Sequence, residues 1–357
     1  MRERWTRLAR RTIAAAALAV VGLYPAAARA QDDDREETPS DNGAHCSSTA
    51  AAVFESCKGG AEADYKLAVG KCINVADSQA RSLCMSEAKA ARDEARQLCQ
   101  EQRMARRDVC AALGEGRYEP NFDPSRFDTD FGNLTHPNPY FPLAIGNKWE
   151  FGGAEEVHIE VLDKTKLIAG VTCITVSDRV TSDGVLAEDT NDWFAHAKNG
   201  DVYYAGEETK EYETFEGDKP PDPELVNIDG SFKTGRDGAK PGIAFFFSPK
   251  VGKVYRQEFD LDNAEDIAQI LSTTYSYGDD PELDRFVPQE LAELLCAGDC
   301  IVVKEFTPLN PGPGGVERKF YAPGIGNFLE IDLESGDVTQ LVGCNFDSRC
   351  NQLPSPE

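Results

Sequence analysis

Two periodicities divide the chain into a helical part and a β part. Between His45 and Gly114, apolar residues recur every three or four positions, and strong helix formers dominate. From Leu143 onward, short runs rich in β-branched and aromatic residues alternate with polar positions and end at Gly, Asn and Asp turn signals. The pattern predicts a multidomain α+β protein, with a helical segment followed by an antiparallel β sandwich or partly open barrel.

Six cysteines in the helical part are placed symmetrically about position 78. The members of each pair are equally distant from that position: Cys46 and Cys110, Cys57 and Cys99, Cys72 and Cys84. Two antiparallel helices joined by a turn near Asp77-Ser78 would bring each pair together. We therefore predict a helical hairpin over residues 45–114 with three nested disulfides, ended by Gly114. The pair Gly59-Gly60 leaves open a break that would give three helices.

Changes in composition set the remaining boundaries. Residues 115–142 are rich in Pro, Asn, Asp and Gly with single aromatic residues, which predicts a connector pinned to the next domain by its rings. The β domain is expected over 143–345, and a C-terminal tail over 346–357. Within the β domain, Asn199-Gly200 predicts a tight hairpin. A short helix is expected at Pro288–Cys296, with proline in its first turn.

The first 30 residues have the features of an export signal. Arginines precede the apolar run Ile13–Leu23, and Ala28-Arg29-Ala30 is a small-residue cleavage site. The following residues, 31–44, are acidic and lack large apolar side chains, so we expect a disordered leader. A second run of about 18 apolar residues is missing, so no membrane span is predicted. We expect export to the periplasm or the extracellular medium, where thiols oxidise.

The charge balance narrows the classes of partner. The 357-residue chain has 62 acidic and 37 basic side chains, for a net charge of -25. Nucleic acids and anionic membrane surfaces attract basic proteins, so this balance argues against both. An unknown ligand or protein partner remains open, with cations, basic proteins and neutral ligands all compatible.

Five cysteines lie in the β part. Cys296, Cys300, Cys344 and Cys350 are expected to form two disulfides, and the sequence leaves their pairing open. A four-thiolate zinc site is the alternative, although the second pair is spaced more widely than usual zinc ligands. Cys173 stands in an apolar run and is expected to be a buried thiol.

No catalytic constellation stands out, and we assign no catalytic or metal-binding residue. With 62 acidic residues in the chain, adjacent carboxylates occur by chance. Asp260–Glu265 is similar to a calcium loop, but it lacks an oxygen ligand at its fifth position and a glycine at its sixth. Calcium is kept as an alternative, and no other cofactor is expected. Aromatic residues of the β part are expected in the core, and four are candidates for lining a cavity in a barrel mouth: Trp149, Trp193, Tyr203 and Tyr255.

A series of short motifs runs from about Asp123 to Phe328. They are NPYFPL (138–143) with Trp149, GVTC (170–173), DWFA (192–195), GDVYY (200–204), DGAKPG (237–242), PKVG (249–252), YRQE (255–258) and YAPG (321–324). Together they resemble an uncharacterised family of exported bacterial proteins. The resemblance implies an exported β-rich domain, and it brings no catalytic residue to this chain.

Three functions follow as hypotheses. The first is an exported non-catalytic module that binds an unknown ligand or partner through its β domain, with the hairpin as a spacer or docking arm. The second is a secreted hydrolase that uses carboxylates or calcium, and the third is an envelope structural protein. Titratable groups that converge in a deep aromatic cleft would count against the non-catalytic hypothesis.

Overall fold

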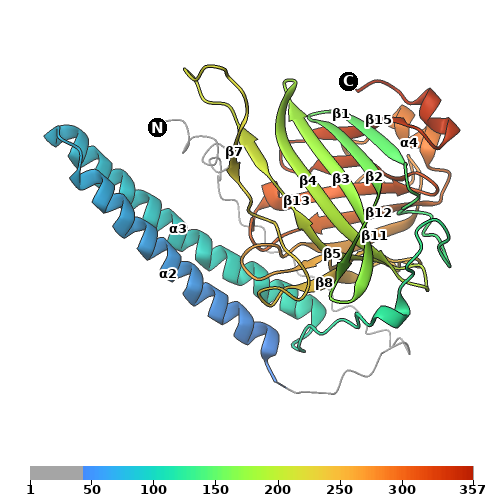
Figure 1. Ribbon diagram of the computed structural model, residues 1–357, viewed down its shortest axis with the longest axis horizontal. Helices are drawn as coiled ribbons and strands as arrows, with labels where there is room; N and C mark the ends of the chain where they lie inside the picture. The colour runs from blue at the N-terminus through green and yellow to red at the C-terminus, as the bar shows by residue number, and fades with distance from the viewer. Residues whose placement is uncertain (1–42, 357) are drawn as a thin grey trace. The chain divides into compact units, whose positions relative to one another are not determined.

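The computed structural model describes residues 43–356, and the predicted export signal and most of the predicted leader lie outside them. Figure 1 shows a long helical hairpin and a β domain with one short helix. The helices are α2 (His45–Ile73), α3 (Ser78–Leu113) and α4 (Gln289–Leu295), with 3-10 turns η1 (Pro124–Arg126), η2 (Pro313–Gly315) and η3 (Ser348–Gln352). The strands are β1 (Lys148–Gly153), β2 (Glu156–Ile168), β3 (Val171–Ser182), β4 (Val185–His196), β5 (Val202–Glu208), β6 (Glu211–Glu213), β7 (Glu224–Asn227), β8 (Lys240–Phe245), β9 (Val254–Arg256), β10 (Glu258–Phe259), β11 (Ile267–Tyr275), β12 (Cys300–Phe306), β13 (Val316–Ala322), β14 (Gly326–Asp332) and β15 (Val338–Cys344).

Helices α2 and α3 form the predicted disulfide-linked hairpin. The three bonds join the cysteines that the mirror spacing pairs: Cys46–Cys110, Cys57–Cys99 and Cys72–Cys84. Asp77 caps the N-terminus of α3 by accepting a hydrogen bond from the Ala80 N–H, and Gly114 ends that helix with a φ of 93°. The alternative of three helices is wrong, because α2 continues through Gly59-Gly60.

The hairpin buries little apolar surface. Its buried apolar residues are mostly small: Ala50, Val53, Ala61, Cys72, Ala88, Cys99, Val109 and Cys110. At its open end, Glu115 closes the two arms, because its side chain accepts from the Ser47 N–H at 2.8 Å and its carbonyl accepts from the His45 N–H at 3.0 Å. Since so small a core contributes little, the disulfides must supply much of the stability of this part.

The β domain is a nearly closed antiparallel barrel, as the strand pattern predicts. The strands follow the order β10-β8-β5-β4-β3-β2-β1-β15-β14-β13-β12-β11-β9, so β9 and β10 lie at opposite ends of the sheet. Only Gln257 separates these two strands in sequence, so one segment, residues 254–259, pairs with both edges and joins them. We call this segment the seam. The glycine at position 242 permits this close pairing of β8 with the seam, because a Cβ on residue 242 would lie 1.9 Å from the Gln257 carbonyl oxygen.

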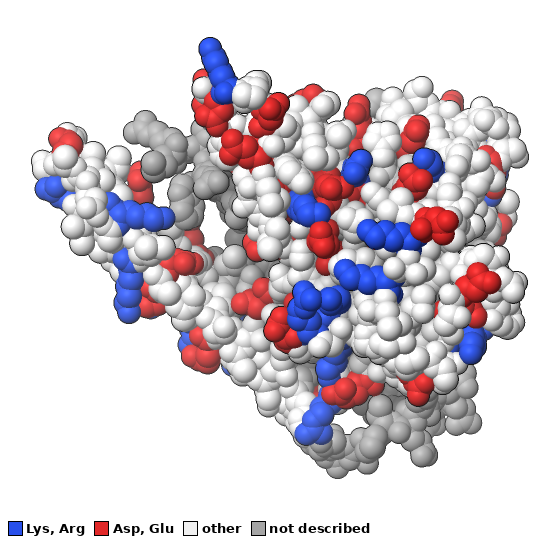
Figure 2. Space-filling model, viewed as in Figure 1, with Lys and Arg blue, Asp and Glu red and all other residues white. Residues whose placement is uncertain are grey.

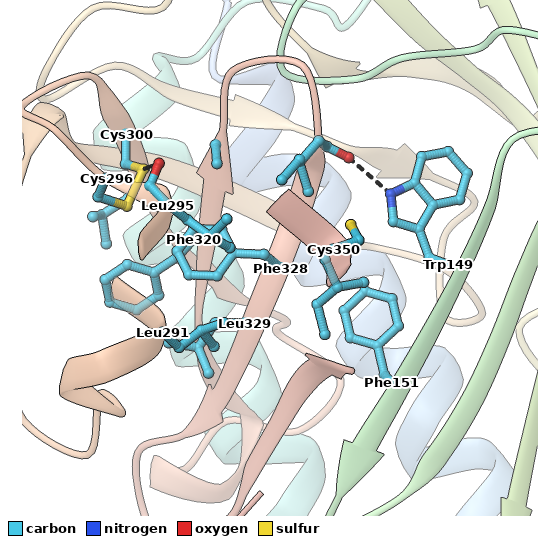
Figure 3. Packing of buried hydrophobic residues seen from close by; sticks show 14 of the residues in the cluster. Trp149, Phe151, Leu291, Leu295, Cys296, Cys300, Phe320, Phe328, Leu329 and Cys350 are labelled. Carbon is cyan, nitrogen blue, oxygen red and sulfur yellow. Dashed lines mark hydrogen bonds between the residues drawn. A yellow bond between two sulfur atoms is a disulfide. The ribbon is translucent and has the colours of Figure 1, made fainter. Parts of the chain in front are cut away.

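Hydrophobic packing of α4 supports the barrel on one side. Leu291 and Leu295 of this helix belong to the same buried cluster as Phe320 and Phe328, as Figure 3 shows. The helix lies within the predicted range, with Pro288 at its N-cap, and the Cys296–Cys300 disulfide follows it directly.

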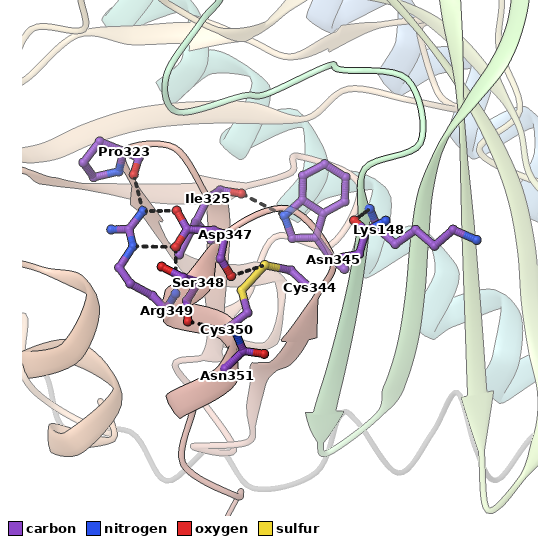
Figure 4. The surroundings of a disulfide bond; sticks show 11 residues. Lys148, Pro323, Ile325, Cys344, Asn345, Asp347, Ser348, Arg349, Cys350 and Asn351 are labelled. Carbon is purple, nitrogen blue, oxygen red and sulfur yellow. Dashed lines mark hydrogen bonds and ion pairs between the residues drawn. A yellow bond between two sulfur atoms is a disulfide. The ribbon is translucent and has the colours of Figure 1, made fainter.

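The last residues close one end of the barrel. Figure 4 shows the Cys344–Cys350 disulfide, which ties η3 to the end of β15. Arg349 donates to the Pro323 carbonyl at 2.8 Å and pairs with Asp347, so residues 346–356 are packed rather than loose. The zinc alternative is wrong, because all four of these cysteines are in disulfides. Cys173 is the buried free thiol that the sequence predicts.

The connector is pinned to the barrel by rings and by one buried polar contact. Phe127 and Phe131 are buried against the strands. His196, at the end of β4, contacts the Asp128 carboxylate at 2.9 Å through Nδ1, and Asp128 also accepts from the Thr135 N–H at 3.0 Å. This contact holds the connector against the end of β4. The Asn199-Gly200 turn that follows has Gly200 at a φ of 91°.

Among the helices of residues 43–356, none combines the length and the apolar character that crossing a bilayer requires. On the face shown in Figure 2, Lys and Arg side chains are interspersed with Asp and Glu.

Candidate ligand-binding cavity

A cavity of about 300 Å³ lies inside the barrel. Its walls come from the strands β1, β2, β3, β4, β5, β8, β10, β12, β13 and β14 and from the end of the connector, residues 140–143. Side chains alternate between the two faces of a strand, so every second residue of these strands points into the barrel. The cavity therefore collects side chains from distant parts of the sequence.

One part of the cavity wall is apolar and largely aromatic. It consists of Phe141, Leu143, Trp149, Phe151, Ile159, Val161, Val176 and Phe194. The Trp149 indole N–H donates to the Ile325 carbonyl at 2.8 Å, which fixes the orientation of its ring (Figure 3). Phe141 meets Phe194 edge to face, with ring centroids 4.9 Å apart. This surface suits the apolar body of a small ligand.

The other part of the wall is acidic. Its ionisable groups are five carboxyl groups and one ammonium group: Asp178, Asp192, Glu258, Asp266, Glu305 and Lys319. We call the whole space the acidic cavity. Burial raises the pKa of Asp178 to about 7 and the pKa of Asp266 to about 6, and nearby carboxylates add to both effects. Burial and neighbouring carboxylates also raise the pKa values of Asp192 and Glu258 well above the usual range.

Tyr204 links Asp192 of the cavity to a further carboxyl group, Glu207, that does not line it. Its hydroxyl lies within hydrogen-bond distance of the Asp192 carboxyl and 2.9 Å from Glu207 Oε2. A phenol has one proton, so it donates to one carboxylate and can accept from the other only when that group is protonated. Burial also raises the pKa of Glu207 to about 7. The contact geometry and the raised pKa values therefore both favour at least one retained proton near neutral pH.

Lys319 does not neutralise the whole cluster. Its ammonium group lies 3.0 Å from Glu305, 3.6 Å from Glu330 and 3.8 Å from Glu317. Burial lowers the pKa of Lys319, but these glutamates outweigh burial and raise it above the usual value. Asp178, Asp192 and Glu258 form no ion pair with a Lys or Arg among residues 43–356, and Asp178 Oδ1 has no hydrogen-bond partner there. The cavity thus retains unpaired acceptors for a cationic group.

Of the four aromatic residues expected to line a cavity, Trp149 lies in this one. The other three do not line this cavity. Trp193 lies between Asp192 and Phe194 on β4, so it points to the opposite face, where the Lys166 ammonium is 3.5 Å from its ring centre and a separate hollow opens. Tyr203 packs on Phe127 of the connector, and Tyr255 packs on Phe246.

The acidic residues of the cavity were missed because carboxylates are so common in this chain. Strand phase carries a usable signal. Asp178 is in phase with the buried Val176, and Asp192 is in phase with the buried Phe194. A charged residue on the apolar phase of a strand costs free energy unless the site uses it. That phase marks Asp178 and Asp192 as candidates, but Thr175 and Trp193 on the opposite phase are buried as well, so only the pairing of the strands decides which face is the interior.

The segment proposed as a calcium loop has other contacts. Asp260 accepts from the Asn263 side-chain amide at 3.0 Å, and Glu265 accepts from Arg106. In residues 43–356, no three His, Cys, Asp or Glu side chains are arranged so that they could hold a metal ion.

No family model, curated protein or solved structure matches this chain. The resemblance to an exported bacterial family therefore stays a prediction. Many residues of the motifs that carry it line the acidic cavity: Tyr140, Phe141, Pro142, Leu143, Trp149, Asp192, Phe194, Tyr204, Gln257, Glu258 and Tyr321.

Proposed function

We propose that the barrel binds a small amphiphilic organic cation in the acidic cavity. The observation that carries this proposal is the division of one wall into an aromatic part and a part with carboxyl groups that lack a cation. An amine or ammonium group would occupy the acidic part, and the apolar body of the same ligand would lie against Trp149 and Phe194. A volume of about 300 Å³ is at the lower end of the range for small-molecule sites.

An organic cation fits these residues better than a metal ion. The acidic part of the wall adjoins an apolar surface. An organic ligand can pack against that surface, whereas a metal ion binds only the oxygen ligands. The clustered carboxyl groups of the described residues also lack a three-ligand arrangement.

Proton linkage follows from the raised pKa values. Asp178, with a pKa of about 7, and Asp266, with a pKa of about 6, are partly protonated near neutral pH. A cation binds best to the ionised carboxylates, so binding would release protons. Affinity is therefore expected to rise from pH 5 to pH 8.

Three probes of nearly equal size test the charge preference. Isothermal titration calorimetry would compare phenethylammonium, phenylethanol and phenylacetate at pH 8 and pH 5, in buffers that differ in ionisation enthalpy. We expect the cation to bind most tightly at pH 8, with release of protons, and its advantage to shrink at pH 5. Equal affinity for all three probes at pH 8 would contradict the proposal.

Matched amide variants locate the binding. Asp178→Asn keeps the size of the side chain, and the Asp178 Oδ1 atom has no hydrogen bond to lose. We expect Asp178→Asn to weaken phenethylammonium binding about tenfold, a difference of about 1.4 kcal/mol. Asp183→Asn alters an exposed carboxyl in the β3–β4 turn and should leave the affinity unchanged.

A hydrolase that uses carboxylates is the second candidate. Titratable groups do converge in a cleft with aromatic walls, which counts against a purely passive cavity. Asp178, with a pKa of about 7, would be a suitable general acid. However, the carboxyl groups raise one another's pKa and so form a single cluster, whereas glycoside hydrolysis uses two carboxyl groups that flank the scissile bond. Inertness on polysaccharide, ester and peptide panels at pH 6 and pH 8 would end this candidate.

Export remains part of the proposal. Five disulfides in the described residues support an oxidising compartment, because such bonds rarely persist in a reducing cytosol. N-terminal sequencing of the protein recovered from outside the cytoplasm should begin at Gln31. An intact N-terminus on protein confined to the cytoplasm would contradict export.

A further inference from the structure

A second cavity lies where the open end of the hairpin meets the seam. Its volume is about 430 Å³. Its walls come from the first turns of α2, the last turns of α3, residues 116–119 and strands β8, β9 and β10. The hairpin and the barrel both contribute, so a bound molecule would contact both.

This cavity has the opposite charge from the barrel interior. Three arginines and one lysine line it, against two glutamates: Arg106, Arg117, Arg256 and Lys240, with Glu119 and Glu265. We call it the basic pocket. In a chain with a net charge of -25, such an excess of cationic side chains is a local feature.

Arg106 and Lys240 bind the two glutamates of the pocket. The Arg106 guanidinium donates to Glu265 through Nε at 3.0 Å and through Nη2 at 2.6 Å, and both side chains are buried. Lys240 binds Glu119. These contacts use both glutamates of the pocket.

Arg256 lacks a comparable partner. Its guanidinium lies over the rings of Tyr118 and Phe259, at 5.6 Å and 5.0 Å from their centres. Its hydrogen-bond contact in residues 43–356 is a long one of 4.0 Å to Cys46 Sγ, and no carboxylate there lies within ion-pair distance. Burial lowers the pKa of Arg256, and Glu265 and Tyr118 offset this only in part. Arg256 is partly buried. A guanidinium does not lose its proton in a protein, so hydrogen bonds to acceptors or an anion would offset the desolvation of its buried part.

We propose that the basic pocket binds a small oxyanion, as a carboxylate or phosphate group, through Arg256 with support from Lys240. The planar guanidinium matches both groups with two parallel hydrogen bonds. The rings of Tyr118 and Phe259 hold the guanidinium in place, so little side-chain entropy is lost on binding. Because α2 and α3 form one wall, the bound anion also stabilises the contact between the hairpin and the barrel.

Calorimetry with two simple anions tests this site on the full chain. Sodium phosphate and sodium succinate would be titrated at pH 7 and low ionic strength, in a chloride buffer. We expect at least one of them to bind, and the tighter one identifies the phosphate or the carboxylate as the preferred group. Arg256→Gln should weaken that binding about tenfold or more, the scale of a lost charge-assisted hydrogen bond.

Two further variants keep the test decisive. Lys253→Gln removes an exposed cation just before the seam, outside the pocket, and should leave the affinity unchanged. Lys240→Gln should give a smaller loss, and it replaces Arg256→Gln if the circular dichroism spectrum of that variant shows misfolding. Failure of both anions to bind, or equal affinity in the parent chain, Arg256→Gln and Lys240→Gln, would overturn the proposal.

Discussion

The acidic cavity and the basic pocket lie on either side of the same stretch of chain. Glu258 and Asp266 line the cavity inside the barrel, whereas Arg256 and Glu265 line the pocket outside it. Adjacent residues of a strand normally point to opposite faces of the sheet. At Gln257 the seam changes from one strand partner to the other, and this change shifts the alternation of its side chains. The barrel wall thus separates an acidic interior from a basic exterior site.

The two regions differ in how a buried charge can be removed. Burial raises the pKa of Asp178 to about 7, so this carboxylate can take up a proton near neutral pH. Arg256 has no such option, since arginine stays protonated. A cluster of buried carboxyl groups can therefore persist without a ligand, whereas a partly buried arginine is stabilised by hydrogen-bond acceptors, water or an anion. The difference predicts pH-dependent behaviour inside the barrel and anion dependence outside it.

The largest expected effect comes from breaking the ion pair in the basic pocket. Arg106 is 5% exposed and Glu265 is 1% exposed, so removing Glu265 leaves the buried guanidinium with only the long contact of 3.5 Å to Asp262. Glu265→Gln should lower the free energy of unfolding by about 3–5 kcal/mol. The double variant Arg106→Met/Glu265→Leu should lose much less, because it removes both charges. Denaturant unfolding measures both changes, and a loss of under about 1 kcal/mol for Glu265→Gln would show that the pair is not needed.

A smaller effect is expected from opening the disulfide beside that pocket. Cys46 and Cys110 line the basic pocket and close a separation of 64 residues. Cys46→Ala/Cys110→Ala should lower the stability of the hairpin by roughly 2–4 kcal/mol. It should weaken anion binding and spare cation binding in the barrel. Hydrogen exchange would compare the amides of α2 and α3 with those of β3 and β4.

The matched control is a disulfide outside the hairpin. Cys344 and Cys350 are separated by 6 residues, so the loop-closure effect of their bond is smaller. Cys344→Ala/Cys350→Ala should therefore leave hydrogen exchange in α2 and α3 unchanged. Faster exchange of β3 and β4 in the Cys46/Cys110 variant would contradict the separation of the two regions.

The smallest expected effect is the pH dependence of the acidic cavity. Asp178 and Asp266 bind protons more tightly in the folded chain, with pKa values of about 7 and 6, than in the unfolded chain, at about 4. Their contribution to stability is complete below pH 4 and is lost as the pH rises through 6 and 7. Asp178→Asn should therefore be about 1–2 kcal/mol more stable than the parent at pH 8 and nearly equal to it at pH 4. The same difference at both pH values would contradict a raised pKa at this site.

Local features of the sequence were sufficient for the hairpin. Its cysteine spacing, the helix formers between the cysteines and the terminal Gly114 each depend on neighbours in the chain, so the disulfide pairing of α2 and α3 could be predicted. The turn at Asn199-Gly200 and helix α4 are also local, since a tight turn and a proline-started helix depend on a few consecutive residues. The antiparallel, β-rich character of the second part followed from alternation of apolar and polar positions, which left a sandwich and a partly open barrel as alternatives.

The cavities depended on pairing between distant strands. Alternation shows that Trp193 and Phe194 face opposite ways, yet it does not tell which face is the interior, and Trp149 alone of the four predicted lining residues reaches the acidic cavity. Closure of the barrel through Gln257, against Gly242, brings Glu258 near Asp192. The sequence by itself determined the hairpin, its disulfides and the presence of many strands, because these follow from short-range geometry. Only the tertiary structure decided where charges of each sign gather, because a site inside or beside a closed barrel is made by residues far apart in the chain.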